Sequence, residues 1–188
     1  MSTSRAGRPK ASSRATLAEA ACELFLEKGY EATSTADIAA RAGVSRSSFF
    51  NYVDSKAGLL WGSLDERLDR LERDLAVPGR SVGDAVRAVA SGFAPDALAL
   101  AFANAEAMGV AAELEREAAL RRARVARAVA GALRRGGTDA LVAEVAGAAY
   151  GGAVVAAVER WSLAGPGRTA LAAVLDEALA AIGLIPTD

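Results

Sequence analysis

The chain of 188 residues has no histidine and a single cysteine, Cys22, and both shortages exclude chemistry. Without histidine there is no imidazole to act as a general base, to bind zinc or to complete a histidine-dependent nucleophile triad. One thiol cannot form an intramolecular disulfide. Because Leu24 and Phe25 follow it closely, we expect Cys22 to be a small apolar group of the core rather than a redox sensor. We also expect no metal and no other cofactor.

Two short stretches resemble catalytic motifs, and each lacks a necessary part. Residues 43–47 begin like a nucleophile elbow, but the final glycine, a preceding strand and any histidine are missing. Residues 165–169 resemble a phosphate loop, but its lysine and its spacing are missing. We therefore predict that the protein is not an enzyme.

Proline is scarce, with five residues, and no segment shows the alternation of β-branched residues that a strand needs. Alanine is abundant and favours helices. The sequence therefore predicts an all-α fold of about nine helices. Glycine and proline punctuation and helical spacing place them at residues 14–28, 34–42, 46–52, 56–75, 82–93, 96–108, 111–135, 139–163 and 169–182.

An apolar leader and long hydrophobic runs are also missing. The longest uncharged run, Val145–Val158, is too short to cross a bilayer, so we expect a cytoplasmic protein without membrane contact. The net charge of −1 argues against coating nucleic acid by bulk charge. However, residues 1–60 carry eight basic and six acidic groups, whereas residues 61–188 carry fourteen and seventeen. A mildly basic N-terminal part is compatible with local DNA contact.

One segment has the layout of a helix-turn-helix: a helix from Ser34 or Thr35 to Ala42, a turn at Gly43, and a second helix. Asp37 is placed to cap the first helix, and glycine supplies the left-handed conformation of a sharp turn. Val44 is expected to fill the corner. The second helix must expose short polar or basic residues to base edges, and Arg46 begins such a stretch.

This segment resembles the TetR family of bacterial transcriptional regulators. The matching stretch is TSTADIAARAGVSRSSFFNYVDSKAGLL, preceded at the usual distance by ELFLEKGYEATS. The resemblance covers residues 14–60. It implies three parts: a basic arm over residues 1–13, a DNA-binding head over residues 14–60, and a helical effector-binding and dimerisation body over residues 61–188.

The resemblance also implies roles for individual residues of the head. Those expected to contact DNA are Thr35, Ser45, Arg46, Ser47, Ser48, Asn51, Tyr52 and Lys56. Among them, Thr35 and Ser45 would meet phosphates at helix N-termini, and Tyr52 and Lys56 would hold the DNA backbone. Family members commonly carry tyrosine at the position of Phe50, so that phosphate contact is missing here. We expect Phe49 and Phe50 to anchor the helix to the core.

Some of these roles have alternatives. Arg46 could read guanine or bind only phosphate, and Ser47 and Ser48 could be ordinary solvated residues. The arm residues Arg5, Arg8 and Lys10 could enter a minor groove or belong to a disordered tail.

The body contains a segment, Val142–Trp161, that is apolar nearly all round and must be buried on both sides. Because its glycines permit close approach, we predict that it pairs with the last helix in a four-helix dimer interface, where the TetR family also dimerises. A purely internal core helix is the alternative. The predicted interface residues are Gly147, Gly151, Val154, Val155, Val158, Leu171, Val174, Leu175 and Leu179.

By resemblance, the preceding helices would enclose an effector pocket. Its candidate lining residues, each of which could instead be plain core, are Phe93, Leu98, Phe102, Asn104, Met108 and Tyr150. Asn104 is the candidate polar anchor in an apolar helix. Glu117 and Arg121, spaced i,i+4, are expected on a solvated face. The C-terminal pattern is similar to that of regulators that respond to acyl-CoA or other lipophilic ligands.

These observations predict a repressor that binds a palindromic double-stranded DNA operator as a homodimer and is released by a small lipophilic effector. The alternative is a DNA-binding activator, or a regulator gated by a protein partner without a small ligand.

Overall fold

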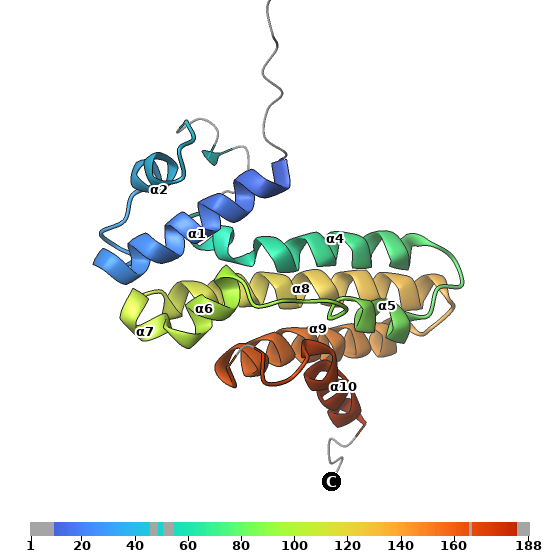
Figure 1. Cartoon of the computed structure of the whole chain (residues 1–188). Coiled ribbons are helices and arrows are strands. Elements are labelled where there is room, and N and C mark those ends of the chain that lie inside the picture. Colours follow the sequence, from blue (N-terminus) through green and yellow to red (C-terminus); the bar gives the residue numbers. More distant parts are fainter. Residues whose placement is uncertain (1–9, 46–48, 51–54, 166, 184–188) are drawn as a thin grey trace, which may run out of the picture.

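The computed structural model describes residues 10–45, 49–50, 55–165 and 167–183, with side chains from Arg14 onward. Over these residues the chain is built of helices and contains no strand, which confirms the all-α prediction. Figure 1 shows α1 and α2 at one end, and α4, α8 and α9 stacked in that order beside them. The helices are α1 Lys10–Lys28, α2 Thr35–Arg41, η1 Ala57–Trp61 (a 3-10 turn), α4 Gly62–Ala76, α5 Val82–Ala88, α6 Ala97–Ala103, α7 Ala105–Met108, α8 Ala111–Arg135, α9 Ala140–Leu163 and α10 Leu171–Ile182.

The first helix begins earlier than the sequence predicts. α1 starts at Lys10 rather than at Arg14, so the last four residues of the predicted flexible arm have helical backbone. The other end agrees with the prediction, because Gly29 follows α1 with a φ of 82°, which a glycine adopts without strain.

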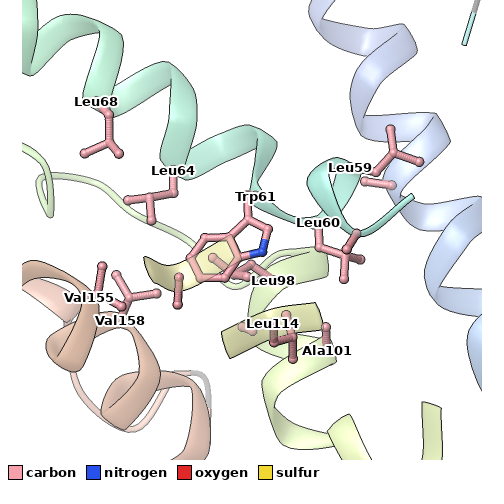
Figure 2. Packing of buried hydrophobic residues seen from close by; sticks show 14 of the residues in the cluster. Leu59, Leu60, Trp61, Leu64, Leu68, Leu98, Ala101, Leu114, Val155 and Val158 are labelled. Carbon is pink, nitrogen blue, oxygen red and sulfur yellow. The ribbon is translucent and has the colours of Figure 1, made fainter. Parts of the chain in front are cut away.

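Residues predicted as one helix over 56–75 form two elements. The 3-10 turn η1 comes first, and α4 follows it from Gly62. Trp61, the last residue of η1, is fully buried, and Figure 2 shows Leu64, Leu98 and Val158 around its ring. This cluster joins α4, α6 and α9, so the long helix after the head is packed firmly into the body.

Two helices of the body are shorter than predicted. α5 ends at Ala88 rather than near Phe93, and the chain then turns through Gly92 at a φ of 61°. The helix predicted over residues 96–108 is interrupted at Asn104, whose φ of −125° separates α6 from α7. By contrast, α8 has the predicted bounds, and Asp139 caps α9 by accepting the N–H groups of Leu141 and Val142.

Two glycines of α9, Gly147 and Gly151, face α8 of the same protomer. A Cβ at Gly147 would lie 2.5 Å from the carbonyl oxygen of Ala126, and one at Gly151 would lie 2.4 Å from that of Arg122. Assigning Gly147 and Gly151 to the dimer interface is therefore wrong, since the α8 backbone occupies that space. The same correction applies to Val154, Val155, Val158, Leu171 and Leu175, which the protomer itself buries. Val174 borders a hollow on the outer face of α9 and α10, and Leu179 is partly buried, so their places in an interface stay predictions.

By length and composition alone, α9 could cross a membrane. However, 44% of its most apolar stretch is buried inside the protein, and the core helix of a soluble protein passes the same test. The extensive packing of α9 against α8, α10 and α6 accounts for its apolar character.

Candidate nucleic-acid interface

The described residues show the first helix and the turn of the expected helix-turn-helix. The side chain of Ser34 accepts the Asp37 N–H at 3.1 Å, and Asp37 Oδ2 accepts the Ser34 N–H at 3.0 Å, which makes a capping box. At the other end, Gly43 turns the chain with a φ of 67°, and the Val44 N–H returns to the Ala39 carbonyl at 3.0 Å. The predicted beginning of the helix at Ser34 or Thr35 and the turn at Gly43 are thus confirmed, and Val44 packs against the core as expected.

The segment after the turn is anchored by one aromatic residue, not two. Phe49 is fully buried, as predicted, whereas Phe50 is 55% exposed and touches Phe49 edge-on at a centroid distance of 5.4 Å. The expectation that Phe50 anchors the helix to the core is therefore wrong. Because consecutive helical residues point in different directions, burying Phe49 turns its neighbour outward.

Most of the predicted DNA-contacting side chains lie outside the described residues: Arg46, Ser47, Ser48, Asn51, Tyr52, and also Arg5 and Arg8 of the arm. Lys10 is described only as the first backbone position of α1. Thr35 is half-buried at the first position of α2, and Ser45 is exposed just after the turn. Both are positions from which a hydroxyl can reach a phosphate, and their roles stay predictions.

Ion pairs clasp α2 onto α1. The Arg41 guanidinium donates to both oxygens of Glu27, at 2.9 and 2.7 Å, and to Glu23 at 3.0 Å. Lys28 Nζ lies 2.8 Å from Asp37 Oδ2. These contacts hold the pKa of Glu27 and of Asp37 below their usual values, since hydrogen bonds to a cation favour the ionised carboxylate.

Lys56 has an internal role that the sequence did not reveal. Its ammonium donates to the carbonyl oxygens of Tyr30 and Thr33, both at 2.9 Å, and lies 4.0 Å from the centre of the Tyr30 ring. These contacts use two of its three donors to close the loop between α1 and α2. The predicted contact of Lys56 with the DNA backbone stays a prediction, with one donor left for it.

The six predicted pocket residues do not enclose a common cavity. Leu98 and Met108 are fully buried, Phe93 stacks edge-on against Trp161 at 5.5 Å, and Phe102 does so against Trp61 at 5.7 Å. Asn104 donates its amide to the Leu100 carbonyl at 2.9 Å, so it is satisfied within its own helix. Of the six, Tyr150 alone lines one of the five hollows described for this structure, beside α5 and α10.

A hollow of about 460 Å³ lies between α1 and α6, and Cys22 and Asp96 both border it. Burial raises the pKa of the Cys22 thiol to about 12, and this thiol donates to the Ala97 carbonyl at 3.5 Å. Burial also raises the pKa of Asp96. It does so although Asp96 accepts hydrogen bonds from the backbone N–H groups of Leu98 and Ala99 at the start of α6, which favour the ionised carboxylate. The low exposure of Cys22, 2%, agrees with the predicted core role.

The sequence missed a set of charged residues at the junction between the head and the body. Arg121 of α8 is 9% exposed and pairs with Asp65 of α4 and Glu117 of α8. The prediction that Glu117 and Arg121 lie on a solvated face is wrong, because α4 and the segment before η1 cover them. Spacing in the sequence could show that this pair shares a helix face, but not that another helix lies over it.

A helix-turn-helix head on an all-α body defines a class, the DNA-binding transcription regulators. Residues 17–60 match the sequence model described as bacterial regulatory proteins, tetR family. Residues 17–60 thus match the TetR family, and the fold of the whole chain is similar to that of the TetR family structures described below.

Two curated relatives align with the N-terminal part. MftR of Mycobacterium tuberculosis, a transcriptional regulator named for mycofactocin biosynthesis, is 35% identical over 69 residues, 37% of this chain and 35% of that protein. The transcriptional repressor ComR of Escherichia coli is 38% identical over 64 residues, 34% of this chain and 30% of that protein. The matched part thus spans about a third of either relative.

Solved structures resemble the whole chain. FadR of Thermus thermophilus, a TetR family repressor solved with lauroyl-CoA, is 28% identical, with a TM-score of 0.52 over 93% of this chain and 96% of that one. NalD of Pseudomonas aeruginosa has the same TM-score over 92% and 96%, at 19% identity, and shows the fold alone.

Proposed function

We propose that this protein is a cytoplasmic, ligand-responsive repressor that binds a palindromic DNA operator as a homodimer. The observation that carries the proposal is the turn at Gly43 after the capped helix α2, followed by a segment that the buried Phe49 anchors in the core. In a helix-turn-helix this segment enters the major groove, and a second copy reads the other half-site one turn away. A single head would contact too few bases for specificity.

The proposed dimer surface is the outer face of α9 and α10. A shallow hollow of about 440 Å³ lies along it, lined mainly by small residues such as Ala149, Gly152 and Ala156. A partner helix can approach closely over such residues. An Ala156→Arg variant is expected to sediment as a monomer, whereas Ala119→Arg on the exposed face of α8 is expected to remain a dimer.

DNA binding can be tested before the operator is known. Duplexes selected from a random pool by the protein should converge on a palindrome, and fluorescence anisotropy then gives the affinity of Arg46→Ala. If Arg46 reads guanine, its loss costs about 1–3 kcal/mol and relaxes preference at one position. If it contacts phosphate only, affinity falls evenly across sequences and the salt slope drops by about one. Arg80→Ala, in the body, serves as the control.

For the effector we propose an acyl-CoA or another lipophilic ligand, supported by the lauroyl-CoA complex of the similar FadR structure. Such a ligand would favour a head spacing that does not fit the operator. Lauroyl-CoA should then release the labelled operator, and free CoA should not. An activator, or a regulator gated by a protein partner, would keep the operator bound with lauroyl-CoA and with free CoA. Transcription from the bound promoter then distinguishes the activator from the partner-gated regulator.

A further inference from the structure

Two of the contacts that tie the head to the body end at Arg121. The first starts at Arg14 in α1, whose Nη2 lies 3.2 Å from Asp65 Oδ2 on α4. Asp65 in turn accepts Arg121 Nη2 at 2.7 Å and Arg121 Nε at 3.0 Å, a two-point contact. This path connects the beginning of the head to α8.

The second contact starts at Ser55, at the other end of the head. Its hydroxyl donates to Glu117 Oε1 at 2.8 Å and accepts the Gly58 N–H at 2.9 Å. The other oxygen of Glu117 accepts Arg121 Nη1. The guanidinium of Arg121 therefore bridges Asp65 and Glu117, while its Cζ atom lies 5.0 Å from the centre of the Trp61 ring.

Glycines make room for both contacts. A Cβ at Gly62 would lie 3.0 Å from Arg14 Nε, and a Cβ at Gly58 would lie 3.0 Å from Ser55 Oγ. A larger residue at either position would require the head's side chain to shift by a few tenths of an ångström. Neither glycine has a left-handed backbone, so the space, and not the turn, is what requires them.

The part of α8 that carries Arg121 also packs tightly against α9. The carbonyl oxygen of the next residue, Arg122, lies against Gly151, where α8 and α9 meet backbone to backbone. Helices in such close contact cannot slide without a clash, so they move as one body. The position of Arg121 is thus fixed relative to the helix that forms the proposed dimer surface.

We propose that Arg121 is a positioning residue that holds the DNA-binding head at one angle on the α8–α9 pair and thereby sets the spacing of the two heads. This inference rests on the proposed function for its consequence in DNA binding. The planar shape of the Arg121 guanidinium matters as well as its charge, because the ammonium of a lysine cannot contact both carboxylates in this arrangement. Arg121→Lys and Glu117→Ala should each free the head while the rest of α8 stays intact.

The head angle can be measured within one protomer. Spin labels at Ala32→Cys in the head and Ala172→Cys in α10 occupy exposed positions, and the buried Cys22 does not compete for the label. Dilution with unlabelled protein isolates the distance within a protomer. The distance distribution should be narrow in the otherwise wild-type chain and broader or shifted in Arg121→Lys and in Glu117→Ala.

Neighbouring residues supply matched controls. Arg122→Lys and Glu115→Ala remove partners of an exposed ion pair on the same helix and should leave the distance unchanged. Operator affinity should fall by roughly fivefold to a hundredfold in the two test variants, the range typical of coupling between sites. Affinity for non-specific DNA should not change, because the phosphate-contacting residues remain.

A distance distribution and an operator affinity like those of the wild type in Glu117→Ala would overturn the proposal. So would the same result in Arg121→Lys, and if that variant fails to unfold cooperatively, Glu117→Ala decides alone. A wild-type chain that neither dimerises nor binds DNA would instead refute the proposed function, and the distance measurement would still test the head angle.

Discussion

Gly151 of α9 lies so close to the Arg122 carbonyl of α8 that a methyl group there would come within 2.4 Å of the oxygen. No side chain can move aside, since the contact is with backbone. The next glycine, Gly152, has nothing within 4 Å of such a methyl group. Two adjacent glycines of one helix therefore have opposite tolerance for alanine.

We predict that Gly151→Ala lowers the free energy of unfolding by about 3 kcal/mol or more, because overpacking forces the two helices apart. In an Ala156→Arg background, which removes the proposed partner helix, Gly152→Ala should instead raise it by up to about 1 kcal/mol, since alanine favours helix over glycine. Urea unfolding at one fixed protein concentration measures both. Equal midpoint shifts for the two variants, each relative to its own background, would contradict the close α8–α9 contact.

Lys56→Met should destabilise the head, because the Thr33 carbonyl loses the Lys56 donor and the Tyr30 carbonyl keeps only the Thr33 N–H. An unsatisfied buried acceptor costs about 1–3 kcal/mol. Hydrogen exchange of the amides between α1 and α2 should quicken, with the salt slope of operator binding unchanged. Lys28→Met, which breaks an exposed ion pair in the same head, should have a smaller effect. Unchanged exchange and a slope lower by about one would indicate that Lys56 mainly contacts phosphate.

The Cys22 thiol should resist alkylation in the folded protein. With a pKa of about 12 and 2% exposure, it is neither ionised nor accessible near pH 8. A maleimide should modify the unfolded chain fully, and in a folded Ala32→Cys variant it should add a single group per chain. Two groups added at equal rates to that folded variant would show that α1 and α6 separate readily.

Asp96→Asn should flatten the acid side of the stability profile. Because burial raises the pKa of Asp96 in the folded state, the folded protein binds the proton more tightly than the unfolded chain. Stability from this group is therefore complete below its ordinary pKa of 3.8 and is lost as pH rises through the folded value.

Asparagine can accept the same N-terminal N–H groups of α6 and carries no charge to desolvate. Near pH 7 the variant should be at least as stable as the wild type, and the difference should shrink as pH falls through the raised pKa of Asp96 and level off below 3.8. Thermal unfolding across this range provides the measurement. A variant that is less stable at every pH would show that the ionised carboxylate is the better cap.

Local signals in the sequence predicted the elements that are closed by local interactions. The capping box at Ser34, the turn at Gly43 and the bounds of α8 all depend on residues within one turn of each other, and all three are confirmed. The break at Asn104 was missed because α6 and α7 together keep a helical pattern. Their separation depends on how they pack beneath α1, not on a residue that forbids helix.

It was harder to predict from the sequence which element packs against each face of a helix. The small, apolar residues of α9 showed that it is buried on several sides, but not that α8, rather than a second subunit, occupies the glycine face. In the same way, Arg121 reads as one charge among many in a polar helix. Its partner Asp65 is 56 residues away, and only the packing of α4 on α8 brings the two together.

The clasp between α1 and α2 affects how salt titrations of DNA binding should be interpreted. α2 has seven residues, too few to persist alone in water, and it is held by exposed pairs such as Arg41 with Glu27. Dissolved ions weaken such pairs as well as phosphate contacts. The logarithmic dependence of affinity on salt would then contain a part that belongs to the protein's own rigidity. Counting displaced counterions from that slope would overstate the number of phosphates touched.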